Sequence, residues 1–331
     1  MSKIQIVGLG ALNIDRIGQV ERFLGDAETA DDAPKYRETE LKWLGTFPGG
    51  SAANTIYGLA RLGINAGFIG AIGDDNEGKA LRQDFQKVGV DTSQIKVKPH
   101  AKTGVALCIS DKLNFRSIHV TPGANSLLTM DDIDLGYINQ AEMLHISSFV
   151  DDAQLSILLA LMDKLDTSVK VSFSLGALYA SKGLAALTSI LARTYVLFIN
   201  ESEMRQLTGG DFSSGARHCL DLGCHIVVVT LGQGVSYKTV TATSYIRTNE
   251  REYVIEPGDK KIISPTDTIG AGDAFAIGFL YGLLTNKGLE TCGQLGDIVA
   301  RFSITKVGAR EGLPTLNELS QRYLELYASE L

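Results

Sequence analysis

The sequence lacks the features that mark several classes of protein. Its 331 residues include only 7 prolines and 4 cysteines, and Cys108, Cys219, Cys224 and Cys292 do not have the spacing of a disulfide framework. We therefore expect a reducing, cytoplasmic setting. The chain has no block of Lys and Arg, and its formal net charge is −7. Such a charge argues against a nucleic acid or an anionic membrane as the partner.

Long apolar runs are absent as well. The longest uncharged run, from Trp43 to Ala60, contains four glycines and is interrupted by Ser, Asn and Thr, so it is not a membrane span. The N-terminal residues lack the apolar core of a signal peptide, and we expect no secretory leader. Hydrophobic residues make up 44% and charged residues 21%, which excludes a disordered chain and indicates a large globular core.

Glycine is what the sequence has in excess. The chain contains 35 glycines without the three-residue period of collagen. Because glycine has no Cβ atom, we expect these residues at turns, at helix ends and where the backbone approaches a ligand closely.

Apolar runs rich in β-branched residues alternate with helical patterns through the second half of the chain. Strands are expected at 143–148, 169–174, 195–199 and 225–230, with helices at 152–165 and 183–192. Continuous apolar runs such as 226–229 suit strands that are buried on both faces of a parallel sheet. The alternation predicts right-handed βαβ units, and hence a three-layer α/β/α fold with a mostly parallel central sheet.

The first half of the chain departs from this alternation. A strand at 3–8 is followed by a polar stretch, a helix at 51–62, a helix at 75–88 and a hairpin formed by 105–110 and 115–120. We therefore expect one domain over residues 1–331. It is interrupted by two excursions, at about 16–48 and 96–121, that form a small β-sheet lid over one edge of the large sheet.

Three segments imitate known motifs without meeting their requirements. Gly8–Asn13 follows a strand as a dinucleotide fingerprint does, but Asn13 replaces the third glycine. Gly73–Ala80 is close to a P-loop, but Ala80 stands where a magnesium-binding Ser or Thr is required. Cys219 and Cys224 have zinc-like spacing, yet a helix and a buried strand suit them equally as small apolar residues.

The segment Asp267-Thr-Ile-Gly-Ala-Gly-Asp273 carries the strongest chemical signal. It precedes a helical run at 274–284, so Gly270 and Gly272 lie at a helix N-terminus, where free amides and the helix dipole favour an anion such as a phosphoryl group. Asp273 then falls in the first helical turn, where a carboxylate can accept a proton from an attacking hydroxyl. The alternative is an ordinary glycine loop with an aspartate cap.

A second helix also begins at glycines. In Phe47-Pro-Gly-Gly-Ser-Ala-Ala-Asn54, the backbone amides near Gly49–Ser51 and the side-chain amide of Asn54 could bind a neutral polyol. The alternative is a structural helix start with Ser51 as the N-cap.

The order of these segments resembles that of the ribokinase family, the PfkB carbohydrate kinases. The Gly-Gly-x-x-x-Asn run and Asp-Thr-x-Gly-Ala-Gly-Asp appear in order. Between them lie further similar motifs: Ala60–Gly63, Pro122–Asn125, Asn200–Glu203 and Thr230–Gly232. The resemblance spans nearly the whole chain. It implies a ribokinase-like α/β/α fold with a small β lid, and ATP-dependent phosphorylation of a hydroxymethyl group.

The resemblance also implies roles for individual residues. Asp273 would be the general base, and the amides of Gly270, Ala271, Gly272 and Asp273 would form the anion hole. The acceptor would be bound by Asn13, Asp15, Gly49, Gly50, Ser51 and Asn54, and the nucleotide by Asn200, Thr230, Gly232, Gly234 and Asp297. Glu203 would hold Mg²⁺ through water, and in some members the backbone around Asp267 and Gly308 binds a monovalent cation such as K⁺.

Two departures from the family pattern stand out. The nucleotide motif is one residue shorter than the usual Thr-x-Gly-x-x-Gly, since it ends at Gly234. The lid segment between Asp15 and Gly49 carries an acidic insert over 26–32. Donor contacts, acceptor size and the homodimer expected through the lid all depend on these segments.

The acceptor is a small molecule, for which the sequence leaves alternatives open. A small sugar such as ribose or fructose is favoured, and a nucleoside kinase for adenosine, inosine or cytidine is the alternative. Arg116 and Lys112 in the hairpin could meet a sugar phosphate or lie on a solvated strand edge. His145 and Phe149 could flank a nucleobase, or His145 could be a core histidine. A sensor that binds the ligand without turnover is less favoured, because it would not need Asp273.

Overall fold

The computed structural model describes residues 3–22, 40–112, 116–259 and 265–331. The acidic insert over 26–32 and the turn of the predicted hairpin at 113–115 lie outside the described residues.

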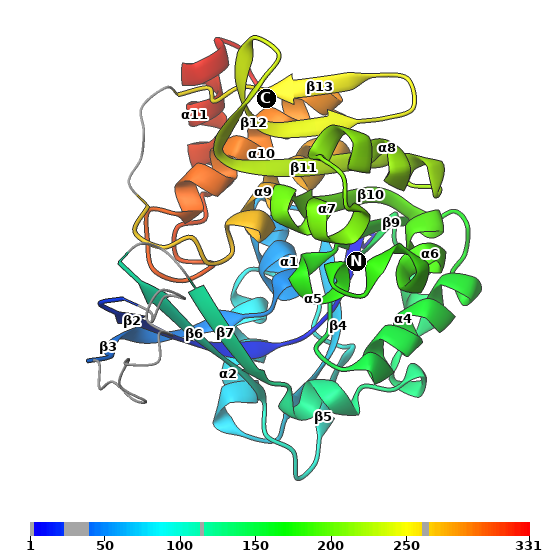
Figure 1. Cartoon of the computed structure of the whole chain (residues 1–331). Coiled ribbons are helices and arrows are strands. Elements are labelled where there is room, and N and C mark those ends of the chain that lie inside the picture. The colour runs from blue at the N-terminus through cyan, green and yellow to red at the C-terminus, as the bar shows by residue number, and fades with distance from the viewer. Residues whose placement is uncertain (1–2, 23–39, 113–115, 260–264) are drawn as a thin grey trace, which may run out of the picture.

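A large, mostly parallel sheet forms the centre of the chain (Figure 1). Its described strands have the order β13-β12-β11-β10-β9-β8-β1-β4-β5, and only β12 and β13 run antiparallel to their neighbours. Their bounds are β1 (Ile6–Leu9), β4 (Ala66–Gly73), β5 (Ile95–Lys98), β8 (Met143–Ser147), β9 (Lys170–Ser174), β10 (Thr194–Asn200), β11 (Ile226–Tyr237), β12 (Val240–Arg247) and β13 (Glu252–Ile255). The predicted fold class is confirmed.

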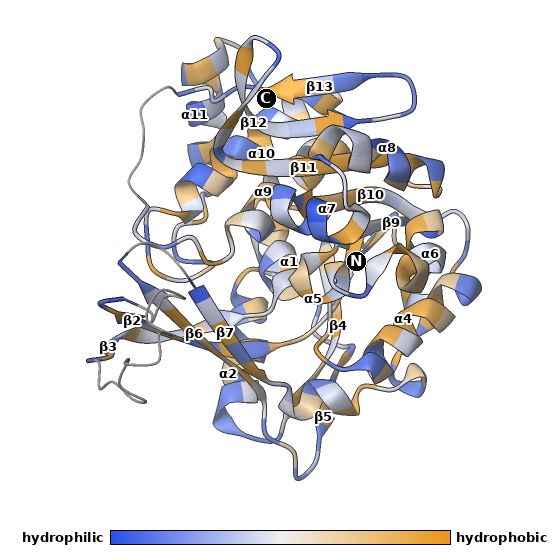
Figure 2. Cartoon of the chain, in the orientation of Figure 1, coloured by the Kyte–Doolittle hydropathy of each residue, from blue (hydrophilic) through white to orange (hydrophobic). Residues whose placement is uncertain are grey.

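Helices cover both faces of this sheet. They are α1 (Ser51–Arg61), α2 (Asn76–Lys87), α3 (Leu135–Ile138), α4 (Asp152–Lys164), α5 (Gly176–Ala180), α6 (Gly183–Arg193), α7 (Glu201–Thr208), α8 (Phe212–Asp221), α9 (Ala271–Leu284), α10 (Leu289–Ser303) and α11 (Leu316–Tyr327), with short 3₁₀ turns η2 (Gly123–Leu127) and η3 (Met130–Asp132). Two buried apolar clusters separate the layers: one joins the sheet to α4–α8, the other joins it to α1, α2 and α9–α11. Figure 2 shows the apolar strands between polar outer helix faces.

A separate small sheet stands beside the large one. Its described strands have the order β3-β2-β6-β7, with β2 (Asn13–Val20), β3 (Lys42–Gly49), β6 (Gly104–Asp111) and β7 (Arg116–Thr121). One of its faces packs against Ile269 and Val307, which belong to the segments before α9 and after α10. The predicted β6–β7 hairpin is confirmed. The expected lid boundaries differ in two places. The small sheet begins with β2 at Asn13, before the expected residue 16, and residues 95–98 pair with β4 and extend the large sheet.

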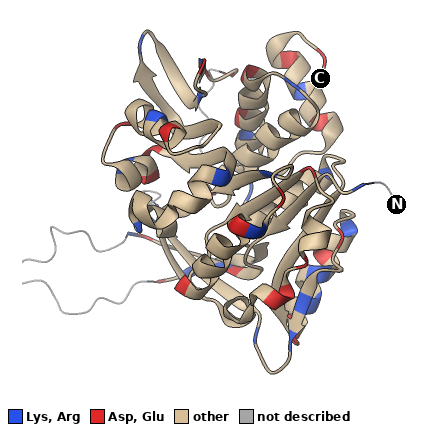
Figure 3. Cartoon of the chain, turned by 90° about the vertical axis from the view of Figure 1, so that its right-hand side faces the viewer, with Lys and Arg blue, Asp and Glu red and all other residues tan. Residues whose placement is uncertain are grey.

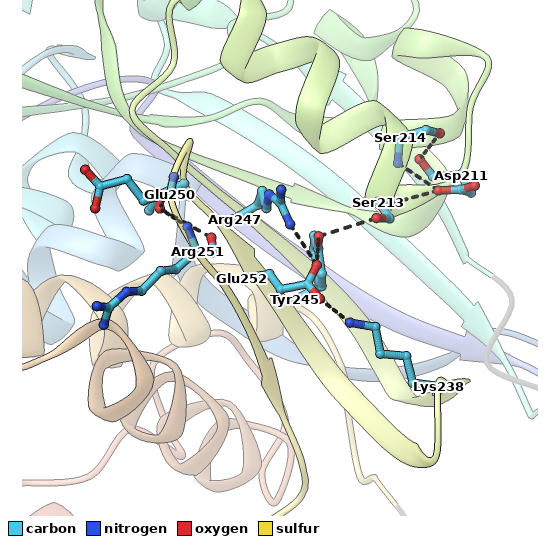
Figure 4. Close-up of polar contacts among 10 residues, drawn as sticks. Asp211, Ser213, Ser214, Lys238, Tyr245, Arg247, Glu250, Arg251 and Glu252 are labelled. Carbon is cyan, nitrogen blue, oxygen red and sulfur yellow. Dashed lines mark hydrogen bonds and ion pairs between the residues drawn. The ribbon is translucent and has the colours of Figure 1, made fainter.

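One further prediction was inexact at the end of its segment. The strand expected at 225–230 continues as β11 to Tyr237, because β12 pairs with its second half after a register shift. Beyond β12, Glu252 of β13 accepts hydrogen bonds from Tyr245 and Arg247 at 2.9 and 2.8 Å and pairs with Lys238 (Figure 4). These contacts hold the outer antiparallel strands together.

Two of the three segments that imitate known motifs have structural explanations. Asp75 caps α2 by accepting from the amide of Gly78 at 2.9 Å, so the P-loop-like segment is the start of an ordinary helix. Cys219 and Cys224 are buried, and within the described ranges no group of three or more His, Cys, Asp or Glu could hold a metal. Basic and acidic residues lie interspersed on the face seen in Figure 3. None of the helices in the described part of the chain is long and apolar enough to cross a membrane.

Candidate active site

The N-terminus of α9 is the centre of the site. Gly270 precedes the helix with φ of 74°, a left-handed conformation that glycine adopts without strain, and its carbonyl accepts from Ala274 at 2.8 Å. The amide of Ala271 donates to the carbonyl oxygen of Thr268 at 3.3 Å. The prediction that this amide is free to bind an anion was therefore wrong. Among the described residues, the amides of Gly272 and Asp273 donate to no oxygen. These two amides are therefore available to an anion.

Asp273 lies in the first turn of α9 and is held by α1. Ser51 Oγ donates to Asp273 Oδ1 at 2.6 Å, although the two residues are 222 positions apart in sequence. Asn54 Nδ2 donates to Asp273 Oδ2 at 2.9 Å. Each carboxylate oxygen thus has one donor that fixes its orientation. The N-cap of α1 is Gly50, so the alternative role of Ser51 as N-cap was wrong.

The environment of Asp273 changes its acidity. Burial raises the pKa of Asp273 to about 6, while hydrogen bonds from Ser51 and Asn54 act in the opposite direction. The charge of Arg310 also lowers this pKa, and that of Glu203 raises it. A carboxylate that titrates close to neutral pH is suited to accept a proton and release it again.

Asp15 on β2 lies directly beside Gly49, just before the start of α1. The Asp15 side chain is only 6% exposed. Burial raises its pKa to about 7, and the nearby charge of Asp273 adds to this effect while Arg310 opposes it. The carboxylate lies so close to Gly49 that a Cβ atom on that residue would be 2.0 Å from Asp15 Oδ1. The pair Gly49–Asp15 therefore requires glycine at this position.

We expect Gly49→Ala to destabilise the fold by about 1–3 kcal/mol, because the added methyl group forces the buried Asp15 carboxylate out of its position. Urea unfolding measures this loss. Gly288→Ala is the matched control, since nothing lies within 4 Å of a Cβ atom there. Equal unfolding midpoints for the two variants would contradict the described packing.

Asn13 is held from a different part of the chain. Asn125, in η2, donates from Nδ2 to Asn13 Oδ1 at 2.9 Å and accepts at Oδ1 from the amide of Leu12 at 2.9 Å. Both Asn13 and Asn125 are buried. The segment Pro122–Asn125 therefore fixes the start of β2, on which Asp15 lies. Sequence reasoning singled out this segment but not its contact with Asn13.

The predicted nucleotide-binding residues gather at the ends of β10 and β11. Asn200 pairs in register with Thr230. Asn200 also caps α7 by accepting at Oδ1 from the Glu203 amide at 2.8 Å, and Glu203 Oε2 accepts in return from the Asn200 amide at 3.0 Å. Gly232 and Gly234 have φ of 60° and 112° and fall in the register shift within β11. The strand therefore bends just after Thr230.

Three other predicted residues have protein partners. Asp297 in α10 forms an ion pair with Arg301 at 2.8 Å, and its nucleotide role stays a prediction. Asp267 accepts from the amides of Ile269 and Gly308 at 3.0 Å each, so it joins the segment before α9 to the one after α10. The proposed cation role of Asp267 and Gly308 is a prediction as well.

Several side chains that sequence reasoning considered lie elsewhere. His145 is fully buried and bonds Ser172 at 2.9 Å, and burial lowers its pKa to about 3. It is a core histidine, and the idea that it flanks a nucleobase was wrong. Phe149 is buried too, but it lines a small cavity together with Asn13 and Asn125, so its role beside a nucleobase stays a prediction. Lys112 forms a surface ion pair with Glu21 at 2.7 Å.

Arg310 is the functional-site residue that sequence reasoning missed. It is 5% exposed and donates from Nε to Asn54 Oδ1 at 2.9 Å. Its only sequence signal is its place two residues after Gly308, because a single sequence does not reveal which arginine is buried.

Comparisons with known proteins show the family to which this chain belongs. The profile described as "pfkB family carbohydrate kinase" matches residues 3–316. An uncharacterized sugar kinase of Archaeoglobus fulgidus is 37% identical, over 78% of this chain and 98% of its own length. An ATP-dependent ribose-1-phosphate kinase of Halopiger xanaduensis is 28% identical, over 97% of this chain and 99% of its own.

A solved structure has the same fold. The Arabidopsis thaliana ribokinase complexed with ribose and ATP superposes with a TM-score of 0.77 at 22% identity, covering 97% of this chain and 98% of that one. The residues matched by the profile include both glycine-led helix starts and the small sheet. This chain belongs to the pfkB family of carbohydrate kinases, which transfer a phosphoryl group to an alcohol.

Proposed function

We propose that this protein transfers the γ-phosphoryl group of ATP to a hydroxymethyl group of a small, ribose- or fructose-like sugar. The observation that carries the proposal is the placement of Asp273, whose two oxygens accept from Ser51 and Asn54 beside the open amides of α9. A carboxylate at an anion-binding helix terminus is costly unless it has a chemical task. Taking the proton of the attacking hydroxyl is that task.

The proposed reaction uses both features of the α9 terminus. As the acceptor oxygen attacks the γ-phosphorus in line, its proton passes to Asp273 and the bond to the ADP oxygen breaks. The negative charge that is spread over the transferring group is met by the amides of Gly272 and Asp273. These amides are fixed before the reaction, so no reorganisation is needed when the charge shifts.

The proposed binding site for the acceptor is supported by the arrangement of Asp15, Gly49 and Asn54. Asp15 is buried beside Gly49, and Asn54 bonds the proposed base, so a polyol bound between them would lie next to Asp273. The small sheet carries Asp15 on β2 and packs on the segment before α9. We propose that this sheet acts as a lid that closes over the acceptor and excludes water.

The proposed binding site for ATP is supported by the residues at the ends of β10 and β11. Glu203 Oε2 accepts from the Asn200 amide at 3.0 Å in the cap of α7, and a carboxylate has further lone pairs that can accept from water. Such a site fits Mg²⁺, which keeps several waters and is bound chiefly by substrate phosphates. When bound, Mg²⁺ supplies positive charge at the phosphates. Asp267 and Gly308 are the proposed location for K⁺.

We also propose a homodimer through the small sheet. Trp43 on β3 is 58% exposed and Ile118 on β7 is 56% exposed, so both outer strands present large apolar side chains to solvent. Burial of such groups is the usual basis of association. Light scattering on the purified protein measures the oligomeric state, and Trp43→Ser should shift it toward the monomer.

ADP release over a panel of acceptors tests the proposed function. The panel contains ribose, fructose, their phosphates and the common nucleosides, each with ATP and Mg²⁺. We expect ADP release that depends on one class of acceptor. Tight binding of an acceptor without ADP release would contradict the kinase proposal and would favour a sensor.

The pH dependence of turnover follows from the state of Asp273. Only the deprotonated carboxylate accepts a proton, so kcat/KM should fall as the pH decreases through about 6. Ser51→Ala removes a hydrogen bond that lowers the pKa of Asp273, and the acidic limb should therefore move to higher pH. A profile of kcat/KM against pH for both proteins measures this. An acidic limb at the same pH in Ser51→Ala would count against the assigned base.

A further inference from the structure

Arg310 is a buried cation that the reaction described above does not use. It lies in the segment between α10 and α11 and is 5% exposed. Its guanidinium stacks on two aromatic rings, at 4.9 Å from the centroid of Tyr57 and 5.3 Å from that of Phe85. These rings and the ion pair below fix the plane of the guanidinium group.

The guanidinium connects three parts of the acceptor side. Nη1 forms an ion pair with Asp84 of α2 at 2.8 Å. Nε donates to Asn54 Oδ1 at 2.9 Å, and Nη2 lies 3.5 Å from the carbonyl oxygen of Gly49. Arg310 thus contacts the turn that begins α1 and the side chain that bonds Asp273.

The contact with Asn54 determines which way its amide points. An asparagine amide has an oxygen that accepts and a nitrogen that donates, and the two ends are similar in shape. Arg310 can only donate, so the Asn54 oxygen must face it. The nitrogen then faces Asp273, to which it donates at 2.9 Å. With the amide reversed, its oxygen would face the carboxylate and repel it.

We propose that Arg310 is a positioning residue for phosphoryl transfer: its guanidinium fixes the Asn54 amide so that Asn54 can orient Asp273, and it holds Gly49 beside Asp15. This inference rests on the proposed function, in which Asp273 is the base. Arg310 itself touches neither the acceptor hydroxyl nor the phosphoryl group; it acts through Asn54.

Lysine cannot take this place. The planar guanidinium donates in several fixed directions at once, and here three of its nitrogens serve three partners. An ammonium on a flexible stem can keep the charge near Asp84 but cannot reach Asn54 and Gly49 in the same geometry. A purely electrostatic role, by contrast, would survive the replacement by lysine.

A double-mutant cycle between Arg310 and Asn54 tests the proposal. We expect Arg310→Lys and Asn54→Ala each to lower kcat by about 10- to 100-fold, the cost of a misplaced catalytic group. If Arg310 acts through Asn54, the double variant should lose no more than the worse single variant, because the same interaction is already gone. Arg310→Met is a second variant, which removes the charge of Arg310 together with its hydrogen bonds. Thermal unfolding identifies any variant that has lost the fold, and Arg310→Lys keeps the buried charge.

Arg247→Met provides the matched control. Arg247 is also an ion-paired, largely buried arginine, bonded to Glu252 at 2.8 Å, but it lies on β12, next to the edge strand β13 (Figure 4). The Arg247→Met variant should leave kcat unchanged, and its effect on the free energy of unfolding should add to that of Asn54→Ala. Losses of kcat that multiply in Arg310→Lys/Asn54→Ala, or full activity of Arg310→Lys, would overturn the inference. If Asp273→Asn keeps wild-type turnover, the proposed function fails instead.

Discussion

Asp273→Asn is expected to lower kcat by at least about 10²–10⁴-fold, the contribution of a positioned general base. Asparagine preserves the size of the side chain and can still bond Ser51, but it cannot take up a proton at the reacting oxygen. If the amide oxygen of the variant faces Asn54 Nδ2 and accepts from it, the amide nitrogen can donate to Ser51 Oγ, so both neighbours keep a hydrogen bond. The expected effect is therefore on kcat, and acceptor-dependent ADP release measures it.

Asp75→Asn is a suitable control for this variant. Asp75 also lies at the start of a helix. Its Oδ1 accepts from the Gly78 amide at 2.9 Å and from Thr103 Oγ1 at 2.6 Å, and its Oδ2 accepts from the Thr103 amide at 2.8 Å. Asparagine is an equally good N-cap, so the fold should persist and turnover should stay close to that of the wild type. Wild-type kcat in Asp273→Asn would mean that another group removes the proton.

Asp15→Asn is expected to stabilise the protein above neutral pH while it weakens acceptor binding. Burial raises the pKa of Asp15 from 3.8 to about 7, so the folded state binds its proton more tightly than the unfolded state does. The stability that this proton contributes is complete below about pH 4 and is lost as the pH rises through 7. Since one unit of pKa corresponds to about 1.4 kcal/mol, Asp15→Asn should gain on the order of 2–4 kcal/mol at pH 8.

Urea unfolding of both proteins at pH 4.5 and pH 8 measures this effect. The difference in unfolding free energy between variant and wild type should increase with pH, because only the wild type loses the contribution of Asp15. The charge of Asp273 contributes to the raised pKa of Asp15, so the difference between the two proteins includes the repulsion between these two carboxylates. If the difference in unfolding free energy stayed constant with pH, burial would not raise the pKa of Asp15. Loss of acceptor affinity in the same variant would link the buried carboxylate to function.

Much of the fold could be predicted because its signals are local. The buried strands β8–β10 and the helices α1, α2 and α9 follow from apolar periodicity and from glycine or aspartate at their ends. The two glycine-led helix starts also identified the site. Strand boundaries that depend on a neighbour were less accurate: β11 continues past Thr230 because β12 pairs with it, and β5 joins the large sheet through β4.

The partners within the site could not be predicted in the same way. Ser51 has the sequence position of a helix cap, yet its hydroxyl bonds Asp273 on another helix. Arg310 has no local pattern around it that distinguishes it from a surface arginine. These contacts join residues that are distant in sequence, so they depend on how α1, α9 and the segment after α10 pack together.

Phosphoryl transfer to a hydroxymethyl group, with Asp273 as the base, is the step on which the proposed function depends. ³¹P NMR of the product from the best acceptor, run beside ADP quantification for the wild type and Asp273→Asn, tests it most directly. We expect one phosphomonoester on a CH₂ carbon for each ADP in the wild type, and almost none in the variant. ADP release without a phosphorylated acceptor, a phosphate on a ring hydroxyl, or equal product from both proteins would contradict it.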